Sequence, residues 1–147
     1  MEMVCQPVIH RRNFIVDVVS FLDEKLYAWE YKSVGDSLSK APLQVENYRE
    51  SFDYVNVATE DAAQLDWLVR KKQRYVKTLL KDLGAGIYWW DLGSFKLIET
   101  PVLQKPRPQL HDDLMKRFKR YVFQEGKRER KRKEELKHNY ELTQFMY

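Results

Sequence analysis

Residues 59–84 read TEDAAQLDWLVRKKQRYVKTLLKDLG, and this stretch decides the predicted fold. Its apolar residues recur at spacings of three and four, which is typical of one face of a helix. Thr59 is a favourable N-cap because its hydroxyl can accept an orphan backbone N–H. Gly84 follows at the position where a left-handed cap residue would end the helix. The stretch therefore predicts one uninterrupted amphipathic helix over residues 60–83.

Further elements are predicted on both sides of this helix. The same spacing predicts a helix over residues 13–32, and another from residue 108 towards the C-terminus. Residues 52–57, FDYVNV, have the composition of a short strand, and the runs 87–90 and 95–98 flank a turn as a hairpin would. The predicted fold class is α+β and predominantly helical, with three main amphipathic helices, one β-hairpin and a long basic C-terminal helix.

Length and composition favour one globular domain. The chain has 147 residues, of which 44% are hydrophobic and 14% aromatic, enough to form a core without disulfides or metal. We expect a globular, α-rich domain over residues 1–125 and a basic helical extension over residues 126–147. Cys5 is the only cysteine, and no window resembles a secretory signal or a membrane span, so an intracellular, cytoplasmic protein is expected.

Positive charge is concentrated towards the C-terminus. Residues 1–69 carry a net charge of −6, residues 70–104 carry +4 and residues 105–147 carry +6. The densest run is KRERKRK at residues 127–133, where six cations surround Glu129. Such a run favours a polyanion or an acidic protein surface as partner, and the alternative is a solvated helix laced with salt bridges or a disordered basic end.

Two groups of cations and a few aromatic residues are the candidate nucleic-acid contacts. On a helix over residues 60–83, four basic residues would lie in one narrow sector opposite the leucine face. The alternative is an ordinary solvated face with an amphipathic tryptophan. The candidate phosphate-binding residues are Arg70, Arg74, Lys77, Lys81, Lys127, Arg128, Arg130, Lys131, Arg132 and Lys133. Trp67, Trp89 and Trp90 are the candidate aromatic contacts, and on a strand the last two would point to opposite faces.

No motif for catalysis or for metal binding is present in the sequence. The three histidines are far apart, and there is no glycine-rich phosphate loop or nucleophile elbow. The sequence therefore predicts a small non-enzymatic nucleic-acid-binding or accessory protein without cofactor, metal or membrane contact. A structural or adaptor subunit, in a larger assembly or a homo-oligomer, is the alternative. A buried pocket with convergent polar groups would instead favour an enzyme.

Overall fold

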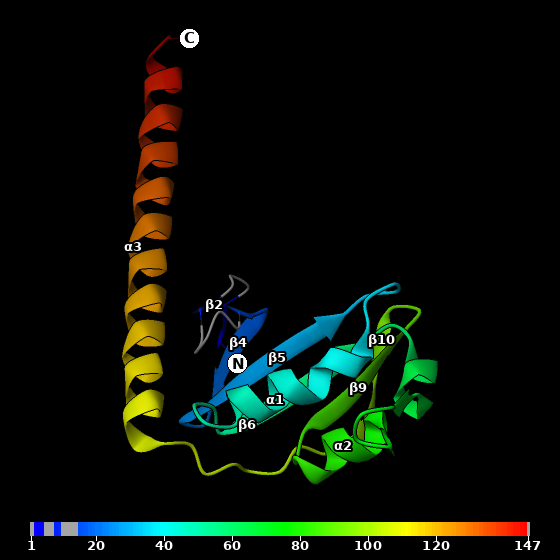
Figure 1. The fold of residues 1–147 in the computed structure, drawn as a ribbon. Helices are drawn as coiled ribbons and strands as arrows, with labels where there is room; N and C mark the ends of the chain where they lie inside the picture. The colour runs from blue at the N-terminus through cyan, green and yellow to red at the C-terminus, as the bar shows by residue number, and fades with distance from the viewer. Residues whose placement is uncertain (1, 5–7, 10–14, 147) are drawn as a thin grey trace. The chain divides into compact units, whose positions relative to one another are not determined.

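The computed structural model describes residues 2–4, 8–9 and 15–146, and its main feature is a six-stranded mixed sheet (Figure 1). The strands follow the order β1-β4-β5-β6-β9-β10; the central β5, β6 and β9 run parallel, and the outer pairs are antiparallel. These strands are Glu2–Val4 (β1), Val18–Leu22 (β4), Lys25–Lys32 (β5), Tyr54–Thr59 (β6), Gly86–Asp91 (β9) and Ser94–Glu99 (β10).

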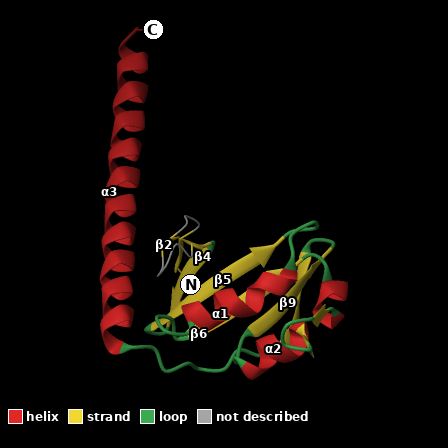
Figure 2. Ribbon diagram, viewed as in Figure 1, coloured by secondary structure: helices red, strands yellow, loops and turns green. Residues whose placement is uncertain are grey.

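Shorter elements connect the strands, as the colouring of Figure 2 shows. The helical elements are η2 (Leu38–Lys40), α1 (Ala41–Tyr48), η3 (Ala62–Asp66), α2 (Val76–Asp82) and α3 (Pro108–Met146). Two small antiparallel ribbons complete the described fold, β2 (Val8–Ile9) with β3 (Ile15–Val16), and β7 (Leu68–Val69) with β8 (Arg74–Tyr75).

The core lies where α1 and α2 cover one face of the sheet (Figure 1). Strand register places the side chains of Ala28, Val55 and Val57 on this face, because residues paired across a sheet point to the same side. All three side chains are completely buried. Side chains alternate between the two faces along β5, so Glu30 and Lys32 lie on the same face as Ala28. Unlike the apolar residues of this face, both are charged.

The opposite face of the sheet is rich in aromatic side chains. Tyr27 stacks on Tyr54 with ring centroids 4.8 Å apart, and Trp29 contacts the ring of Tyr88 at 5.2 Å. The indole N–H of Trp29 donates a hydrogen bond to the Ser20 hydroxyl at 2.9 Å. These contacts satisfy the one polar group of the indole beneath the aromatic layer.

The predicted fold class, predominantly helical, is wrong. The first predicted helix that does not form covers residues 13–32. Its first two positions lie outside the described residues, and the remainder forms β3, followed by β4 and β5 joined by a tight turn. Asp23 and Glu24 close this turn at φ values of 50° and 63°. Apolar residues on both faces of β5 imitated helical spacing, since Leu26 and Ala28 enter the core while Tyr27 and Trp29 form the aromatic layer.

The predicted helix over residues 60–83 is also wrong over most of its length. Only Val76–Asp82 is α-helical, and it follows η3 and the β7–β8 hairpin. Gln73, at φ 49°, ends the hairpin loop in a conformation that no α-helix contains. The apolar residues of α2 still enter the core, because Val76 and Leu80 are fully buried.

Three other elements match their predictions. The hairpin of β9 and β10 is present, with Leu92 and Gly93 at positive φ in its turn, and β6 occupies the predicted short strand. The long C-terminal helix is α3. Contacts divide the chain into two units, residues 1–111 and residues 112–147, and α3 begins in the first and runs through the second. None of the helices in the described ranges is long and apolar enough to cross a membrane.

Candidate functional site

Charged side chains interrupt the core face of the sheet at the carboxyl end of β5. Glu30 is 4% exposed, and its carboxylate lies 3.2 Å from the ammonium of Lys32. Asp17 immediately precedes β4, in which Val18 pairs with Trp29, so Asp17 falls opposite Glu30. Its Oδ2 accepts a hydrogen bond from the Tyr31 amide at 2.9 Å, which holds the second carboxylate beside the first.

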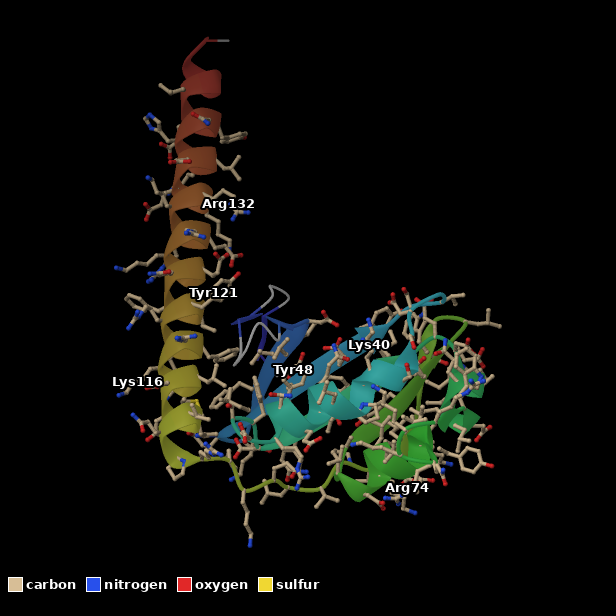
Figure 3. The ribbon with its side chains drawn as sticks, viewed as in Figure 1. Lys40, Tyr48, Arg74, Lys116, Tyr121 and Arg132 are labelled. Carbon is tan, nitrogen blue, oxygen red and sulfur yellow. The ribbon has the colours of Figure 1, made fainter. Side chains whose placement is uncertain are left out.

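Helix α1 supplies two further polar side chains to the same place. Gln44 Nε2 donates to Glu30 Oε1 at 2.9 Å, and the Tyr48 hydroxyl donates to Glu30 Oε2 at 3.2 Å. The two residues are four apart, so they share one face of the helix. We name Asp17, Glu30, Lys32, Gln44 and Tyr48 the Glu30 cluster. Tyr48, labelled in Figure 3, is its only fully buried aromatic member.

The environment of the cluster changes the acidity of its members. Burial raises the pKa of Glu30 above its ordinary value, and the negative charge of Asp17 raises it further, while Lys32 opposes both. Burial, assisted by the charge of Glu30 and the hydrogen bond to it, raises the pKa of the Tyr48 phenol well above its usual range. The phenol therefore remains a hydrogen-bond donor to the carboxylate at any physiological pH.

The cluster contains two carboxylates and an amide oxygen, which are ligand types of a hard divalent cation, and both oxygens of Glu30 already have partners in Gln44, Tyr48 and Lys32. Oxygen ligands from one or two carboxylates, with further sites left for water and phosphate, are what Mg²⁺ takes. Gln44 Oε1 is buried and has no hydrogen-bond partner among the described residues, so one amide oxygen is left unsatisfied at the cluster. Within the described ranges no group of three or more His, Cys, Asp and Glu side chains is placed to hold a metal ion.

The cations predicted as a helical stripe do not form one. Arg70 lies in the loop between β7 and β8 and Arg74 lies on β8, whereas Lys77 and Lys81 are on α2. Arg74, labelled in Figure 3, is paired with Asp82. Lys81 lies 3.8 Å from a carboxylate oxygen of Glu99 on β10. The four cations therefore lie on three different elements, the β7–β8 loop, β8 and α2.

The second group of candidate cations lies on the exposed part of α3. Lys127, Arg128, Arg130, Lys131, Arg132 and Lys133 are all exposed. Two pairs stabilise this part of the helix locally: Arg128 with Glu125 at 2.8 Å, and Lys133 with Glu129 at 3.6 Å. Lys127 also lies 4.6 Å from the centre of the Phe123 ring.

The three candidate aromatic contacts lie in different environments. Trp89 and Trp90 are neighbours on β9 and point to opposite faces, as predicted. The Trp89 ring has the ammonium of Lys96 5.0 Å from its centre, and the Trp90 ring lies 4.6 Å from that of Phe95. Trp67 is 53% exposed at the base of the β7–β8 hairpin.

Sequence reasoning missed the Glu30 cluster because it assigned residues 13–32 to a helix. Had the region been identified as a strand, the alternation of Leu26, Ala28, Glu30 and Lys32 would have placed two charges on an apolar face. A buried charge pair of this kind indicates a functional site more often than a solvated face does.

Comparison with known proteins identifies a fold and no family. No family model matches the chain, and no curated protein matches it. A solved structure described as the SPO1766 protein of unknown function from Silicibacter pomeroyi is similar, with a TM-score of 0.57 and 19% sequence identity. The match covers 84% of this chain and 75% of the other. At this identity the likeness concerns the fold alone.

Proposed function

We propose that this protein binds nucleic acid and hydrolyses its phosphodiester bonds, with a divalent cation held at the Glu30 cluster. The observation that carries the proposal is the convergence of Asp17, Glu30 and Lys32 at the carboxyl end of a parallel strand, a common position for ligand sites in such sheets. Two carboxylates suit the cation, and a lysine suits the phosphate.

Each residue of the cluster has a distinct task in this proposal. Asp17 and Glu30 would provide oxygens for a bound cation, and such a cation would polarise the phosphoryl group and the attacking water. Lys32 is positioned by Glu30 to donate to a phosphoryl oxygen, where negative charge grows as water attacks phosphorus and the ester P–O bond breaks. Gln44 and Tyr48 hold the Glu30 carboxylate in one orientation.

Nucleic acid is favoured over a small phosphodiester by charge outside the cluster. The chain carries a net charge of +4, and exposed cations occupy both the β7–β8 hairpin and α3. Exposed lysines and arginines release counterions when they meet a polyphosphate. The non-enzymatic accessory role predicted from the sequence is the second candidate, and the basic run on α3 supports it equally.

Cleavage of fluorescently labelled DNA and RNA oligonucleotides tests the proposal. The wild-type protein is expected to cut at least one of them in Mg²⁺ or Mn²⁺ and to stop when EDTA is added. Asp17→Asn, Glu30→Gln and Lys32→Met should each reduce the rate by at least about a hundredfold, the usual scale for one stabilising group. The matched control is Asp23→Asn in the exposed β4–β5 turn, where asparagine tolerates the positive φ.

Two outcomes would contradict the proposal. Cleavage that is equal in Glu30→Gln and wild type would come from a contaminating nuclease or from another site. Absence of cleavage by a folded wild-type protein in both cations, with nucleic-acid binding intact, would leave the non-enzymatic role.

A further inference from the structure

The β7–β8 hairpin leaves an unusual set of side chains in solvent. Leu68 pairs with Tyr75 across the ribbon, and the amide of Val76 donates to the Trp67 carbonyl at 2.9 Å, which fixes the base of the hairpin. Trp67, Leu68 and Tyr75 are nevertheless 53%, 52% and 55% exposed. Their rings and methyl groups cover little of this unit's core, so a folding role does not account for them.

Three unpaired cations occupy the tip of the same hairpin. Arg70, Lys71 and Lys72 are consecutive and exposed, and none forms an ion pair with any residue that the structure describes. The loop is ordered by a hydrogen bond from the Lys72 amide to the Val69 carbonyl at 3.0 Å. Arg74 differs from these three because Asp82 holds it.

The hairpin is attached at the end of the sheet that carries the Glu30 cluster. Strand β6 ends at Thr59, which pairs with Lys32, and the amide of Glu60 donates to the Lys32 carbonyl at 2.9 Å. The side chain of Gln64, in η3, accepts a hydrogen bond from the Leu38 amide at 2.8 Å. This bond connects the segment before the hairpin to η2, which follows β5 in the chain. All of these residues belong to the first unit.

We propose that the hairpin is a single-strand grip: Arg70, Lys71 and Lys72 contact neighbouring phosphates, and Trp67 and Tyr75 stack on unpaired bases. This inference rests on nucleic acid being the partner, as proposed above, and does not depend on hydrolysis. Cationic side chains beside exposed aromatic rings are the combination that binds single strands. The phosphates of a duplex would bind the cations equally well. Its base faces are already stacked on one another, so they cannot stack on Trp67 and Tyr75.

Fluorescence anisotropy with labelled oligonucleotides in EDTA tests the grip without cleavage. The wild type is expected to bind a 12-nucleotide single strand at least about tenfold more tightly than a blunt duplex of the same length. The joint change of Arg70, Lys71 and Lys72 to Gln should weaken single-strand binding and reduce the slope of log affinity against log salt by about 2, for three phosphate contacts. Changing Lys105, Lys116 and Lys119 to Gln removes the same charge from exposed positions elsewhere and should alter the slope less.

Removal of the rings separates stacking from charge. Trp67→Leu with Tyr75→Leu keeps apolar bulk, and should weaken single-strand binding by about tenfold or more with an unchanged salt slope. Phe123→Leu, at a ring that is 58% exposed on α3, is the matched control and should have no such effect. Equal affinity for single strand and duplex, or a ring variant that binds like wild type, overturns the grip.

Hydrolysis of bis(4-nitrophenyl) phosphate distinguishes failure of the grip from failure of the proposed chemistry. This small diester needs no grip, so the triple hairpin variant should hydrolyse it at the wild-type rate in Mn²⁺. If the hairpin variants bind single strands as tightly as wild type, the grip is overturned, even if hydrolysis of the small diester depends on Glu30. If the hairpin variants lost activity on this small diester, the hairpin would be shown to maintain the Glu30 cluster and not to bind a nucleic-acid single strand.

Discussion

The Tyr48 hydroxyl donates to Glu30 Oε2 across 3.2 Å, joining a fully buried helix residue to the charged end of a strand. Glu30 also accepts from Gln44 and lies against Lys32, so three side chains hold one carboxylate. Burying a carboxylate is costly unless it is paired and hydrogen-bonded, and these partners offset that cost.

Stability should fall with rising pH through the titration of Glu30. Its pKa is raised above the ordinary 4.5, mainly by burial and next by Asp17, so the folded protein retains a proton that the unfolded chain releases. The contribution is complete below pH 4.5 and is lost as the pH rises through the folded pKa. Urea unfolding of wild type and Glu30→Gln should therefore diverge over this window, and the variant should lack the fall.

Removal of the Asp17 charge should lower the pKa of Glu30. The carboxamide of Asp17→Asn can still accept from the Tyr31 amide, so local structure is preserved while the like charge disappears. Carbon-13 NMR titration of the Glu30 carboxyl measures the shift directly. The same titration on Asp23→Asn should match wild type, and an unchanged Glu30 in Asp17→Asn would mean that the two carboxylates are not neighbours.

Tyr48→Phe should destabilise the fold by about 1 to 3 kcal/mol near neutral pH, the scale of a hydrogen bond to a charged acceptor. The ring stays in place, so packing is preserved and the lost donor accounts for the change. The pKa of Glu30 should rise further, since the hydrogen bond from Tyr48 lowers it. Tyr140→Phe on α3, where the side chain is 66% exposed, is the control and should change thermal stability very little. A Tyr48→Phe melt equal to wild type would show that the bond contributes nothing.

Gly86 begins β9 at a point where no side chain fits. A Cβ at this position would lie 2.0 Å from Asn56 Oδ1 and 3.0 Å from Pro101, whereas a Cβ at Gly126 on α3 would meet nothing within 4 Å. Gly86→Ala should therefore lower the free energy of unfolding by about 1 to 3 kcal/mol. Gly126→Ala should leave the core unaffected and increase the helical circular dichroism signal. Equal melting midpoints for Gly86→Ala and wild type would contradict the close approach of Asn56 on β6 to Gly86 on β9.

Truncation after Gln124 should leave the melting midpoint of the remaining chain nearly unchanged. Residues 126–142 are exposed, and pairs such as Glu129 with Lys133 contribute only tenths of a kcal/mol. The truncated protein should instead show a flatter dependence of nucleic-acid affinity on salt. A large fall in the midpoint would indicate that Leu136, Tyr140 and Leu142 pack on a second molecule, as the adaptor alternative requires.

The sequence predicted the β9–β10 hairpin and α3 correctly, and it failed where helical spacing extended across strands, even with Thr59 and Gly84 as favourable caps. Leu92 and Gly93 identify the β9–β10 turn, and Pro108 marks the start of α3. Strand β5 was predicted wrongly because both of its faces carry large apolar side chains, which hide its period of two. The same error concealed the site, because on a predicted helix Glu30 and Lys32 do not share a face.

The hairpin at residues 67–75 could not have been found from the pattern around it. Its loop, RKKQ, contains no glycine or proline, and Gln73 takes the positive φ that glycine usually provides. The surrounding Leu65, Val76 and Leu80 keep helical spacing although Leu65 lies on η3 and the other two lie on α2. Tertiary contacts of η3 and α2, which local propensity does not encode, divide this segment.

Binding of Mn²⁺, followed by electron paramagnetic resonance, tests the central claim most directly because it needs no substrate. A single site should be seen on the wild-type protein, unchanged in Asp23→Asn and weakened at least about tenfold in both Asp17→Asn and Glu30→Gln, since each removes one of the two carboxylates. Mn²⁺ binding that is equal in Glu30→Gln and wild type, or that is absent from the folded wild type at millimolar cation, would contradict the account.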